Sequence, residues 1–480
     1  MPAQPSITRP RRSGGYHPVV GEATVPEPTV SGRLPRDLDG SFLRIGPNAL
    51  SRNALRQAGH AATAGGHLLS GQPMVHGVRI RDGRAEWYRN RWVRTDQVAG
   101  TLGGLPTPGP RHGLSDECNG NLLHHAGRTY AVGDGGVLPT ELDRDLGTVA
   151  RSDFDGTLPA GFSAHPEHDP VTGELYAVAY YHELPYAHFL TIGVDGRVRR
   201  AEQIAMKQTS MMHAFSLTDR HAVLYDLPVV YHPAAAAAGS RIPYAWDDNH
   251  GARLGILPRD GGDADVLWVD IDPCYVFHPV NAYQTAGNRL VIDVVRHERV
   301  FDRDRHDLTE SLPALWRWVV DLSAGIVAET QLDDHIEEFP RIDERYRGTR
   351  HRYAYAVAMR CEDGTGLGSA AARRARAGHS VNPSAGPLAG AALVRHDLDA
   401  RRTALHEFGP GRETGEAVFV PRGADAPEGD GWLMSMVYDR STDRSELVVL
   451  DTADFTGEPV ATVHLPVRVP HGFHAAWIPA

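Results

Sequence analysis

The sequence predicts an all-β fold, and a closed β-propeller fits it best. Helical periodicity is weak throughout, whereas short runs rich in β-branched and aromatic residues recur between Gly, Pro, Asp and Asn. A parallel α/β fold would need helices of about ten or more residues between its strands, and the sequence has no such alternation. For a chain of 480 residues, a propeller accommodates this many strands better than a sandwich does.

Seven short runs predict individual strands of this fold. They are bounded by turn-forming residues and are mostly apolar, as buried strands are. The runs cover residues 130–132, 174–181, 221–227, 289–295, 353–359, 432–438 and 446–451. Three of the preceding turns begin at Gly127, Gly173 and Asp219, so successive turns are 46 residues apart. Because one four-stranded propeller blade takes about 40 to 50 residues, this spacing indicates one blade per step.

Charge and cysteine content exclude several classes of function. The chain has 49 basic and 60 acidic side chains, a net charge of −11, and no block of five like charges. A nucleic-acid partner is therefore not expected. The cysteines, Cys118, Cys274 and Cys361, are far apart and form no C-x-x-C pair. This pattern excludes a disulfide framework, a thiolate zinc site and an iron–sulfur cluster, and it indicates a reducing compartment.

No segment predicts export or membrane insertion. The N-terminus has an Arg pair without a following apolar run, and no stretch of 18 apolar residues occurs. We therefore expect a cytoplasmic protein. We further expect a loosely ordered tail over residues 1–30 and a single domain over residues 31–480. Within that domain, a low-complexity loop rich in Gly, Ala, Ser and Arg is expected near residues 363–391.

A second insertion, VVYHPAAAAAG at residues 229–239, is small and apolar. A surface helix or loop is the favoured interpretation. The alternatives are a cover over a cleft and a peripheral contact with a membrane surface. The sequence leaves the oligomeric state undefined.

Three histidines occupy equivalent places in strand–turn–strand units. His165, His213 and His278 each end, or nearly end, an apolar run, and the next strand begins 7 to 9 residues later. In a propeller the innermost strand of each blade follows the central axis, so equivalent positions on different blades converge there. His471 and His474 compete for a fourth place, because a propeller is commonly closed by its terminal segments. Neutral imidazoles suit Fe, Zn, Cu or Ni, so the spacing alone does not name the metal.

Nine motifs carry a resemblance to a known family. They are LDGSFLRIGPN (38–48), MVHGVRIRDGRAEWYRNRWVRT (74–95), AHPEHDPVTGEL (164–175), MMHAFSLT (211–218), YVFHPVNAY (275–283), EEFPRID (337–343), GEAVFVPR (415–422), DGWLMSMVYD (430–439) and RVPHGFHAAW (468–477). With these motifs in family order, the chain resembles the carotenoid cleavage oxygenases. That family includes retinal-forming, apocarotenoid-cleaving and stilbene-cleaving dioxygenases.

The resemblance implies a seven-bladed β-propeller, capped on one face by long loops and short helices, with a non-haem Fe(II) on its axis. The AHP, MMH, FHP and GFH motifs match the family's iron ligands at His165, His213, His278 and His474. His471 is then left with a role in surface or packing contacts. No organic cofactor is implied.

Three carboxylates are implied as hydrogen-bond partners of the iron ligands. The EFPRI and EAVFVPR motifs match at Glu338 and Glu416, while the GDGG turn places Asp134 where the family has Glu. A metal-bound His usually donates its other N–H to such a group, which fixes the ring. The Asp side chain is shorter by one methylene, about 1.5 Å of reach. We therefore expect the hydrogen bond of Asp134 to be lost or bridged by water.

The implied activity is Fe(II)- and O₂-dependent cleavage of a conjugated C=C bond in a carotenoid or apocarotenoid, giving aldehyde or ketone products. The partners are then a hydrophobic small molecule and O₂. Stilbene cleavage is one alternative, but the Tyr and Lys that hold the phenol in stilbene-cleaving members match Trp92 and Gly133, which do neither. We expect Trp92 to line a tunnel for a polyene instead. The other alternative is a propeller that keeps the metal and isomerises or binds its ligand without cleaving it.

Overall fold

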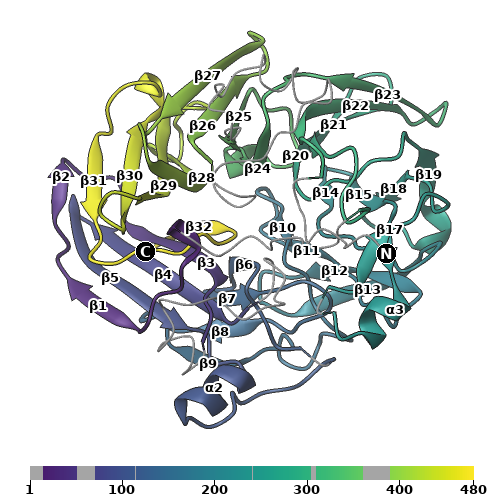
Figure 1. Cartoon of the computed structure of the whole chain (residues 1–480). Helices are drawn as coiled ribbons and strands as arrows, with labels where there is room; N and C mark the ends of the chain where they lie inside the picture. The colour runs from purple at the N-terminus through teal and green to yellow at the C-terminus, as the bar shows by residue number, and fades with distance from the viewer. Residues whose placement is uncertain (1–13, 51–70, 114, 241, 304–309, 360–389) are drawn as a thin grey trace, which may run out of the picture.

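Seven antiparallel β-sheets stand around one central axis as the blades of a propeller (Figure 1). The structure is a computed structural model, and it describes residues 14–480 except 51–70, 114, 241, 304–309 and 360–389. The predicted all-β propeller is confirmed, with the seven blades that the family resemblance implies.

Four of the blades consist of four consecutive strands. One contains β6 (Asn121–His125), β7 (Arg128–Val132), β8 (Thr140–Leu142) and β9 (Thr148–Arg151). The next contains β10 (Glu167–His168), β11 (Leu175–Ala179), β12 (Tyr186–Ile192) and β13 (Val198–Ala205). Another contains β20 (Pro279–Thr285), β21 (Arg289–Arg296), β22 (Ala314–Asp321) and β23 (Ile326–Gln331). The fourth contains β24 (Glu337–Arg341), β25 (Tyr353–Ala358), β26 (Ala392–Asp397) and β27 (Arg402–Glu407).

A fifth blade is interrupted by an excursion of the chain. Its strands are β14 (Ser216–Leu217), β15 (His221–Asp226), β18 (Arg253–Pro258) and β19 (Leu267–Asp270). Between β15 and β18, the strands β16 (Val229–Tyr231) and β17 (Tyr244–Trp246) form a separate two-stranded sheet, with α3 (Pro233–Ala237) between them. The apolar insertion at residues 229–239 is therefore a strand followed by a short helix.

The two remaining blades combine both ends of the chain and close the ring. One contains β28 (Arg412–Pro421), β29 (Gly431–Asp439), β30 (Arg444–Asp451), β31 (Ala461–His464) and β2 (Val30–Gly32). The other contains β1 (Ala23–Pro26), β5 (Arg84–Trp92), β4 (Pro73–Arg81), β3 (Gly40–Pro47) and β32 (Ala475–Pro479). Because β32 pairs with β3, closure through the terminal segments is confirmed.

The loosely ordered tail predicted over residues 1–30 is too long, because part of this segment belongs to the fold. Residues 23–26 pair with residues 87–90 of β5, and the chain before them already forms the 3-10 helix η1 (Gly14–Tyr16). The strand is an edge strand of four half-exposed or exposed residues, so it lacks the apolar run by which buried strands are recognised. Residues 1–13, and residues 363–389 of the predicted low-complexity loop, lie outside the described part of the chain.

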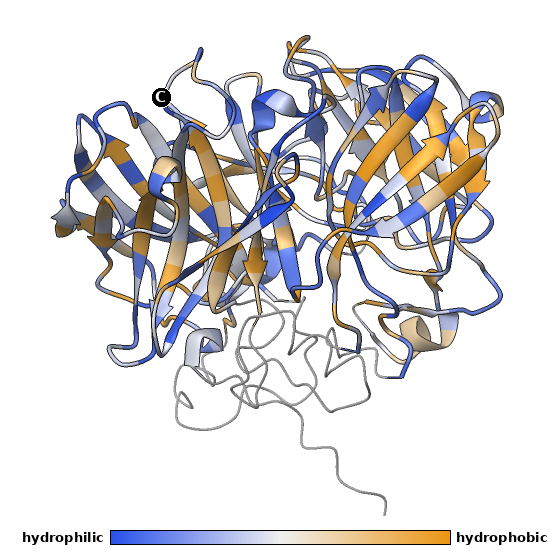
Figure 2. Cartoon of the chain, turned by 90° about the horizontal axis from the view of Figure 1, so that it is seen from above, coloured by the Kyte–Doolittle hydropathy of each residue, from blue (hydrophilic) through white to orange (hydrophobic). Residues whose placement is uncertain are grey.

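All seven predicted strands are confirmed, in β7, β11, β15, β21, β25, β29 and β30, with ends that differ by at most two residues. These strands lie inside their blades and are apolar on both faces, as the hydrophobic stretches in Figure 2 illustrate. In β29, for example, every residue except the last is buried.

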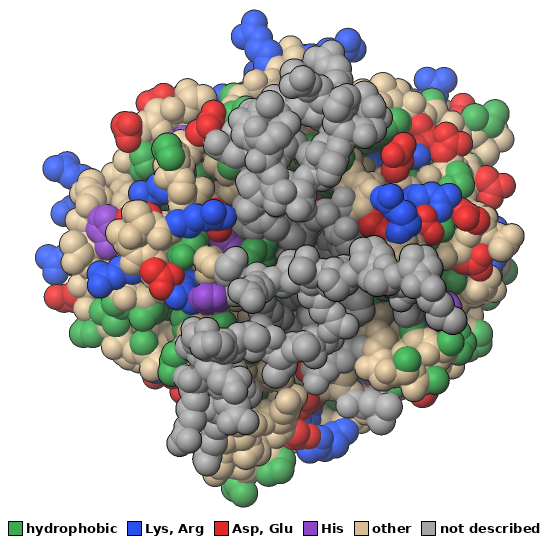
Figure 3. All heavy atoms as spheres, in the orientation of Figure 1, with side chains coloured by type: hydrophobic (Ala, Val, Ile, Leu, Met, Phe, Trp, Pro, Cys, Tyr) green, Lys and Arg blue, Asp and Glu red, His purple; other side chains and the backbone are tan. Residues whose placement is uncertain are grey.

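Short helices accompany the loops of the propeller. α2 (Asp96–Leu102) begins where Val98 N donates to Thr95 Oγ1 at 3.2 Å and ends at Gly103. Three 3-10 helices lie elsewhere in the described chain, η2 (Asp263–Asp265), η3 (Glu344–Tyr346) and η4 (Thr452–Asp454). Charged side chains of both signs surround the face seen in Figure 3. In the described part of the chain, no helix combines the length and the apolar character needed to cross a membrane.

Candidate metal centre

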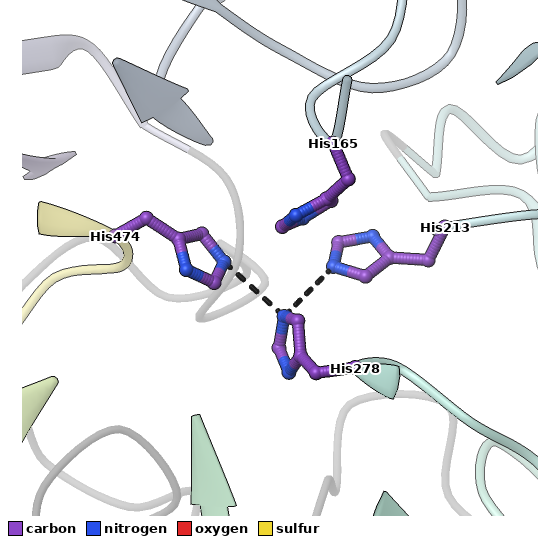
Figure 4. A group of neighbouring side chains, drawn as sticks. All are labelled: His165, His213, His278 and His474. Atoms are coloured by element: carbon purple, nitrogen blue, oxygen red, sulfur yellow. Dashed lines mark hydrogen bonds between the residues drawn. The ribbon is translucent and has the colours of Figure 1, made fainter. Parts of the chain in front are cut away.

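Four histidines converge where the innermost strands of four blades begin (Figure 4). His165 lies two residues before β10 and His213 lies three residues before β14, while His278 and His474 immediately precede β20 and β32. One nitrogen of each ring lies within 4.8 Å of the corresponding nitrogen of every other ring. Equivalent places on different blades are thus brought together on the axis, and the closing strand supplies the fourth ring.

Two glutamates orient two of these rings. His278 Nδ1 donates to Glu338 Oε2 at 2.6 Å, and His474 Nδ1 donates to Glu416 Oε1 at 3.0 Å. A carboxylate only accepts, so each ring carries its proton on Nδ1. The unprotonated Nε2 of each ring is then directed at the centre of the cluster, which is the tautomer that binds a metal.

Asp134 makes the corresponding contact in spite of its shorter side chain. Its Oδ2 accepts a short hydrogen bond from His213 Nδ1, and its Oδ1 accepts from Ala164 N at 3.4 Å. The expectation that this hydrogen bond is lost or bridged by water is therefore wrong. A Cβ atom at Gly133 would lie 2.7 Å from the carbonyl oxygen of Glu117, so glycine lets the turn pack closely and carry Asp134 within reach.

The central nitrogen atoms have no proton to share. His213 Nε2 and His474 Nε2 lie 3.3 and 3.1 Å from His278 Nε2 (Figure 4). With the Nδ1 protons directed at carboxylates, lone pair faces lone pair, which is unfavourable unless a cation lies between them. His165 Nε2 is buried and has no hydrogen-bond partner among the described residues. A divalent transition metal would satisfy all four nitrogens, so the donor set fits such an ion.

Burial favours the uncharged form of two of the central rings, His278 and His165. It lowers the pKa of His278 to about 4, although the charge and the hydrogen bond of Glu338 oppose this effect. Burial, followed by the three neighbouring rings, holds the pKa of His165 well below its usual range. Because a metal competes with protons for imidazole nitrogen, rings that are neutral at ordinary pH are ready to bind.

β-Bulges aim both glutamates at the axis. The pairing of β24 with β25 changes register between Glu338 and Arg341. The pairing of β28 with β29 changes register between Thr414 and Ala417, on either side of Glu416. A bulge inserts an extra residue and takes side chains out of the regular two-residue alternation. Through its bulge, each of the innermost strands β24 and β28 thus presents a carboxylate to a histidine.

Phe339 occupies one of these bulges in a strained conformation. Its φ of +56° lies in the left-handed region, which costs a residue with a Cβ about 1–2 kcal/mol. The ring stacks on His278 at 5.3 Å between centroids and meets His474 edge-on at 5.4 Å. The strain therefore holds an aromatic wall against two of the four rings.

A cavity of about 750 Å³ ends at the four rings. Its apolar walls include Leu138, Met211, Phe277, Ile336, Phe339 and Met359, of which Phe277 and Phe339 contact the rings. Beside α2 the walls are charged, with Asp96, Arg111, Asp116 and Arg151. The cavity thus combines charged and apolar walls and reaches the candidate metal centre.

Trp92 does not line this cavity, and His471 lies outside the four-histidine cluster. Trp92 ends β5 and packs with Met74 and Val98, and β4, β3 and β32 separate its strand from the axis. The expectation that Trp92 lines the substrate tunnel is therefore wrong. His471 is buried, and its Nε2 donates to Glu413 Oε2 at 2.5 Å, so its contacts are packing contacts inside the fold.

Comparison with known proteins places the chain in a family. A sequence model described as "Retinal pigment epithelial membrane protein" matches residues 16–479. The carotenoid cleavage oxygenase of Mycobacterium tuberculosis is 40% identical to this chain, over 98% of this chain and 97% of its own length. The chain belongs to the carotenoid cleavage oxygenase family.

Two further proteins illustrate the breadth of the carotenoid cleavage oxygenase family. The carotenoid 9,10(9′,10′)-cleavage dioxygenase of Crocus sativus is 31% identical, over 97% of this chain and 88% of its own. The crystal structure of Pseudomonas brassicacearum lignostilbene dioxygenase is 25% identical over the whole of both chains, with a TM-score of 0.84.

Family motifs and histidine spacing left two residues beside the centre without a role. His297, at the end of the β21 apolar run, donates from Nε2 to Glu338 Oε1 at 2.9 Å. Arg341 donates to the carbonyl oxygen of Ala475 at 2.8 Å and lies 3.6 Å from Glu416 Oε1. Burial raises the pKa of Glu416, but the charge of Arg341 and the contact with His474 lower this pKa to about 2. Glu416 therefore stays ionised.

The strain at Phe339 predicts that its glycine variant is more stable than its alanine variant, the reverse of the usual order in a strand. Phe339→Ala and Phe339→Gly both remove the ring, but only glycine adopts positive φ freely. Phe339→Gly should therefore be the more stable variant by about 1 kcal/mol in urea unfolding. The matched control is Phe419 in β28, which has no positive φ. At Phe419 the Ala variant should be the more stable, because glycine weakens an ordinary strand. The same order at both positions would contradict strain at Phe339.

Proposed function

We propose that this protein uses Fe(II) and O₂ to cleave a conjugated C=C bond of a carotenoid or apocarotenoid into aldehyde or ketone products. One observation carries the proposal. Four imidazole nitrogens that lie within 4.8 Å of one another belong to residues that line a cavity, and apolar side chains form part of the same wall. Membership of the carotenoid cleavage oxygenase family supports the same reaction class.

The residues that would hold the iron are His165, His213, His278 and His474. These four neutral ligands would hold the ion, and bound Fe(II) would supply the redox chemistry for the reaction of O₂ with an electron-rich double bond. The protein's own contribution is orientation. Asp134, with the two glutamates, keeps the protons on Nδ1 and the Nε2 lone pairs directed inward.

The walls of the cavity would bind the polyene and exclude water. Phe277 meets His213 edge-on at 5.4 Å, and Phe339 stacks on His278, so aromatic faces flank the candidate metal centre. A long conjugated chain needs such a surface because burial of its apolar area supplies most of the binding energy. The double bond next to the centre would then be held in place by contacts along the rest of the chain.

A phenolic stilbene is the competing substrate, because a solved relative is a lignostilbene dioxygenase. Neither Trp92 nor Gly133 is among the described residues that line the cavity, so the two matched positions carry no argument against a phenol. Because Phe277 and Phe339 present apolar surface beside the rings, we expect a preference for polyenes over resveratrol of at least about 10-fold, unchanged in Trp92→Phe.

The deciding experiment loads the protein with Fe(II) under anaerobic conditions and then admits O₂ together with one candidate substrate. Carotenoids, apocarotenals and resveratrol are compared, and product masses are measured. Shorter aldehydes from a polyene support the proposal, and their lengths identify the cleaved bond. A product of unchanged mass would indicate an isomerase instead, while resveratrol cleavage with the polyenes untouched would assign the competing substrate.

A further inference from the structure

Glu338 accepts hydrogen bonds from two imidazoles, and only one of them belongs to the candidate metal centre. Its Oε2 accepts from His278 Nδ1 at 2.6 Å, while its Oε1 accepts from His297 Nε2 at 2.9 Å. His297 directly follows β21 and is among the residues that line the cavity. Because a carboxylate only accepts, the Nε2 of His297 carries the proton of that ring. His297 thus fixes the second oxygen of the carboxylate whose first oxygen orients His278.

The other two carboxylates of the centre have their second oxygen fixed by the backbone. Glu416 Oε2 accepts from Ala475 N at 2.6 Å. Asp134 Oδ1 accepts from Ala164 N at 3.4 Å. A backbone N–H is present in every residue except proline, so these contacts depend little on the side chains nearby. The contact at the second oxygen of Glu338 depends instead on one side chain, which a single substitution removes.

His297 is paired with the segment that carries His278. Its backbone N–H donates to the carbonyl oxygen of Tyr275 at 2.8 Å, and Tyr275 N donates in return at 2.9 Å. Tyr275 lies three residues before His278, and the ring of Phe277 meets that of His297 edge-on at 5.3 Å. Backbone pairing therefore holds the two imidazoles in a fixed relation, and Glu338 bridges them.

One ring nitrogen of His297 is unsatisfied. The residue is only 3% exposed, and its Nδ1 is buried without a hydrogen-bond partner among the described residues. A buried polar atom without a partner destabilises a fold, and an apolar side chain at this position would avoid that loss. Packing alone therefore does not account for an imidazole at residue 297, whereas the contact of its Nε2 with Glu338 does.

We propose that His297 is a positioning residue of the metal centre. By donating to Glu338, it keeps this carboxylate in the orientation that directs the Nε2 lone pair of His278 inward. Without that donor, one oxygen of a buried carboxylate is unsatisfied, and the carboxylate turns away from the imidazole to find another partner. The inference rests on the proposed function only through its metal centre, and it is independent of which substrate is cleaved.

The test measures the affinity of the metal-free full chain for Co(II), in the absence of O₂ and substrate. Co(II) binds imidazole nitrogen as Fe(II) does, and its visible absorption reports the coordination geometry. The wild type is compared with His297→Leu, His297→Asn and His297→Gln. The amide nitrogen of Gln reaches the place of an imidazole Nε2, whereas that of Asn reaches only the place of Nδ1. Of the three variants, only the Gln variant therefore restores the donor to Glu338.

His297→Leu and His297→Asn should weaken Co(II) binding by about 10- to 100-fold, as is typical of partners that orient a ligand, and should change the visible spectrum. His297→Gln should restore most of the affinity and the wild-type spectrum. A Gln variant that binds no better than the Asn variant would overturn the proposal. Wild-type affinity in His297→Leu would overturn it as well.

His396 gives the matched control. It is buried, and its Nε2 donates at 2.8 Å to Glu337 Oε2, on the residue before Glu338 in β24. His396→Leu should lower the midpoint of thermal unfolding, while the folded protein keeps its Co(II) affinity and spectrum. An equal loss of affinity in His396→Leu and His297→Leu would show general destabilisation and would overturn the role of His297.

A double-mutant cycle tests whether His297 acts through Glu338. In the Glu338→Gln background, His297→Leu should weaken Co(II) binding much less than it does in the wild type, because the carboxylate that it positions is gone. Additive losses would overturn the proposal. Failure of the wild type to bind Co(II) would overturn the metal centre and this inference together. Absence of cleavage, with the expected Co(II) affinities observed, would overturn only the proposed reaction.

Discussion

Replacing any one of the four central histidines with alanine is expected to abolish iron retention and oxygenase activity. In each of His165→Ala, His213→Ala, His278→Ala and His474→Ala, one of four nitrogens within 4.8 Å of each other is lost. The outer partners of metal ligands are typically worth about 10- to 100-fold, so a ligand itself should be worth at least that. Iron should therefore fall from about one per chain to background after desalting, and turnover should fall at least about 100-fold.

His471→Ala is the matched control for these four variants. It removes a buried imidazole from the same C-terminal segment, three residues before His474, and its partner is Glu413 instead of a residue of the centre. It should lower the midpoint of thermal unfolding while the folded fraction retains iron. Loss of iron equal to that of His474→Ala would contradict the choice between the two histidines. Full iron retention in one of the four central variants would remove that residue from the ligand set.

The strands predicted from sequence share one physical property, which is burial on both faces. β11 is buried at every residue and β29 at nearly every residue, so each appears in the sequence as an apolar run. The outermost strands β13 and β23 alternate between half-exposed and exposed residues, and the innermost strands β10 and β14 have only two residues each. Neither kind gives a pattern that is distinguishable from a loop.

The candidate centre could be predicted because its histidines repeat in a common context, whereas its support depends on irregular backbone. The bulge that turns Glu338 toward His278 and the positive φ of Phe339 have no signature in spacing. The same limit explains the error at Trp92, where a motif match gave the residue but not its distance from the axis.

Replacing each of the three carboxylates with a neutral amide should lower iron retention and turnover by a different factor. In Glu338→Gln the carbonyl oxygen of the amide replaces only one oxygen of a carboxylate that accepts from His278, His297 and the Phe339 N–H. The NH₂ group then faces a donor inside a buried site, which leaves both groups unsatisfied. We expect iron retention and turnover to fall by about 10- to 100-fold in this variant.

Glu416→Gln should behave similarly, because Glu416 accepts from His474 Nδ1 and from the Ala475 N–H at 2.6 Å. Asp134→Asn should cost less, since its second oxygen accepts only the 3.4 Å contact from Ala164 N. Glu413→Gln is the control, because Glu413 accepts from an imidazole in the same way but outside the centre. It should leave iron retention unchanged, and a loss as large as that of Glu338→Gln would indicate general destabilisation instead.

Asp134→Glu gives the sharpest test of this order, because it restores the residue that the family has at this position. Asp134 already accepts a direct hydrogen bond from His213 Nδ1, and glycine at residue 133 packs the turn against the backbone of Glu117. No gap separates the carboxylate from the ring, so a side chain that is longer by one methylene must displace either the ring or the turn. We expect Asp134→Glu to retain less iron than the wild type at equal protein concentration. Equal or better retention would mean that the Asp134 contact is stretched in solution, as the shorter side chain by itself suggests.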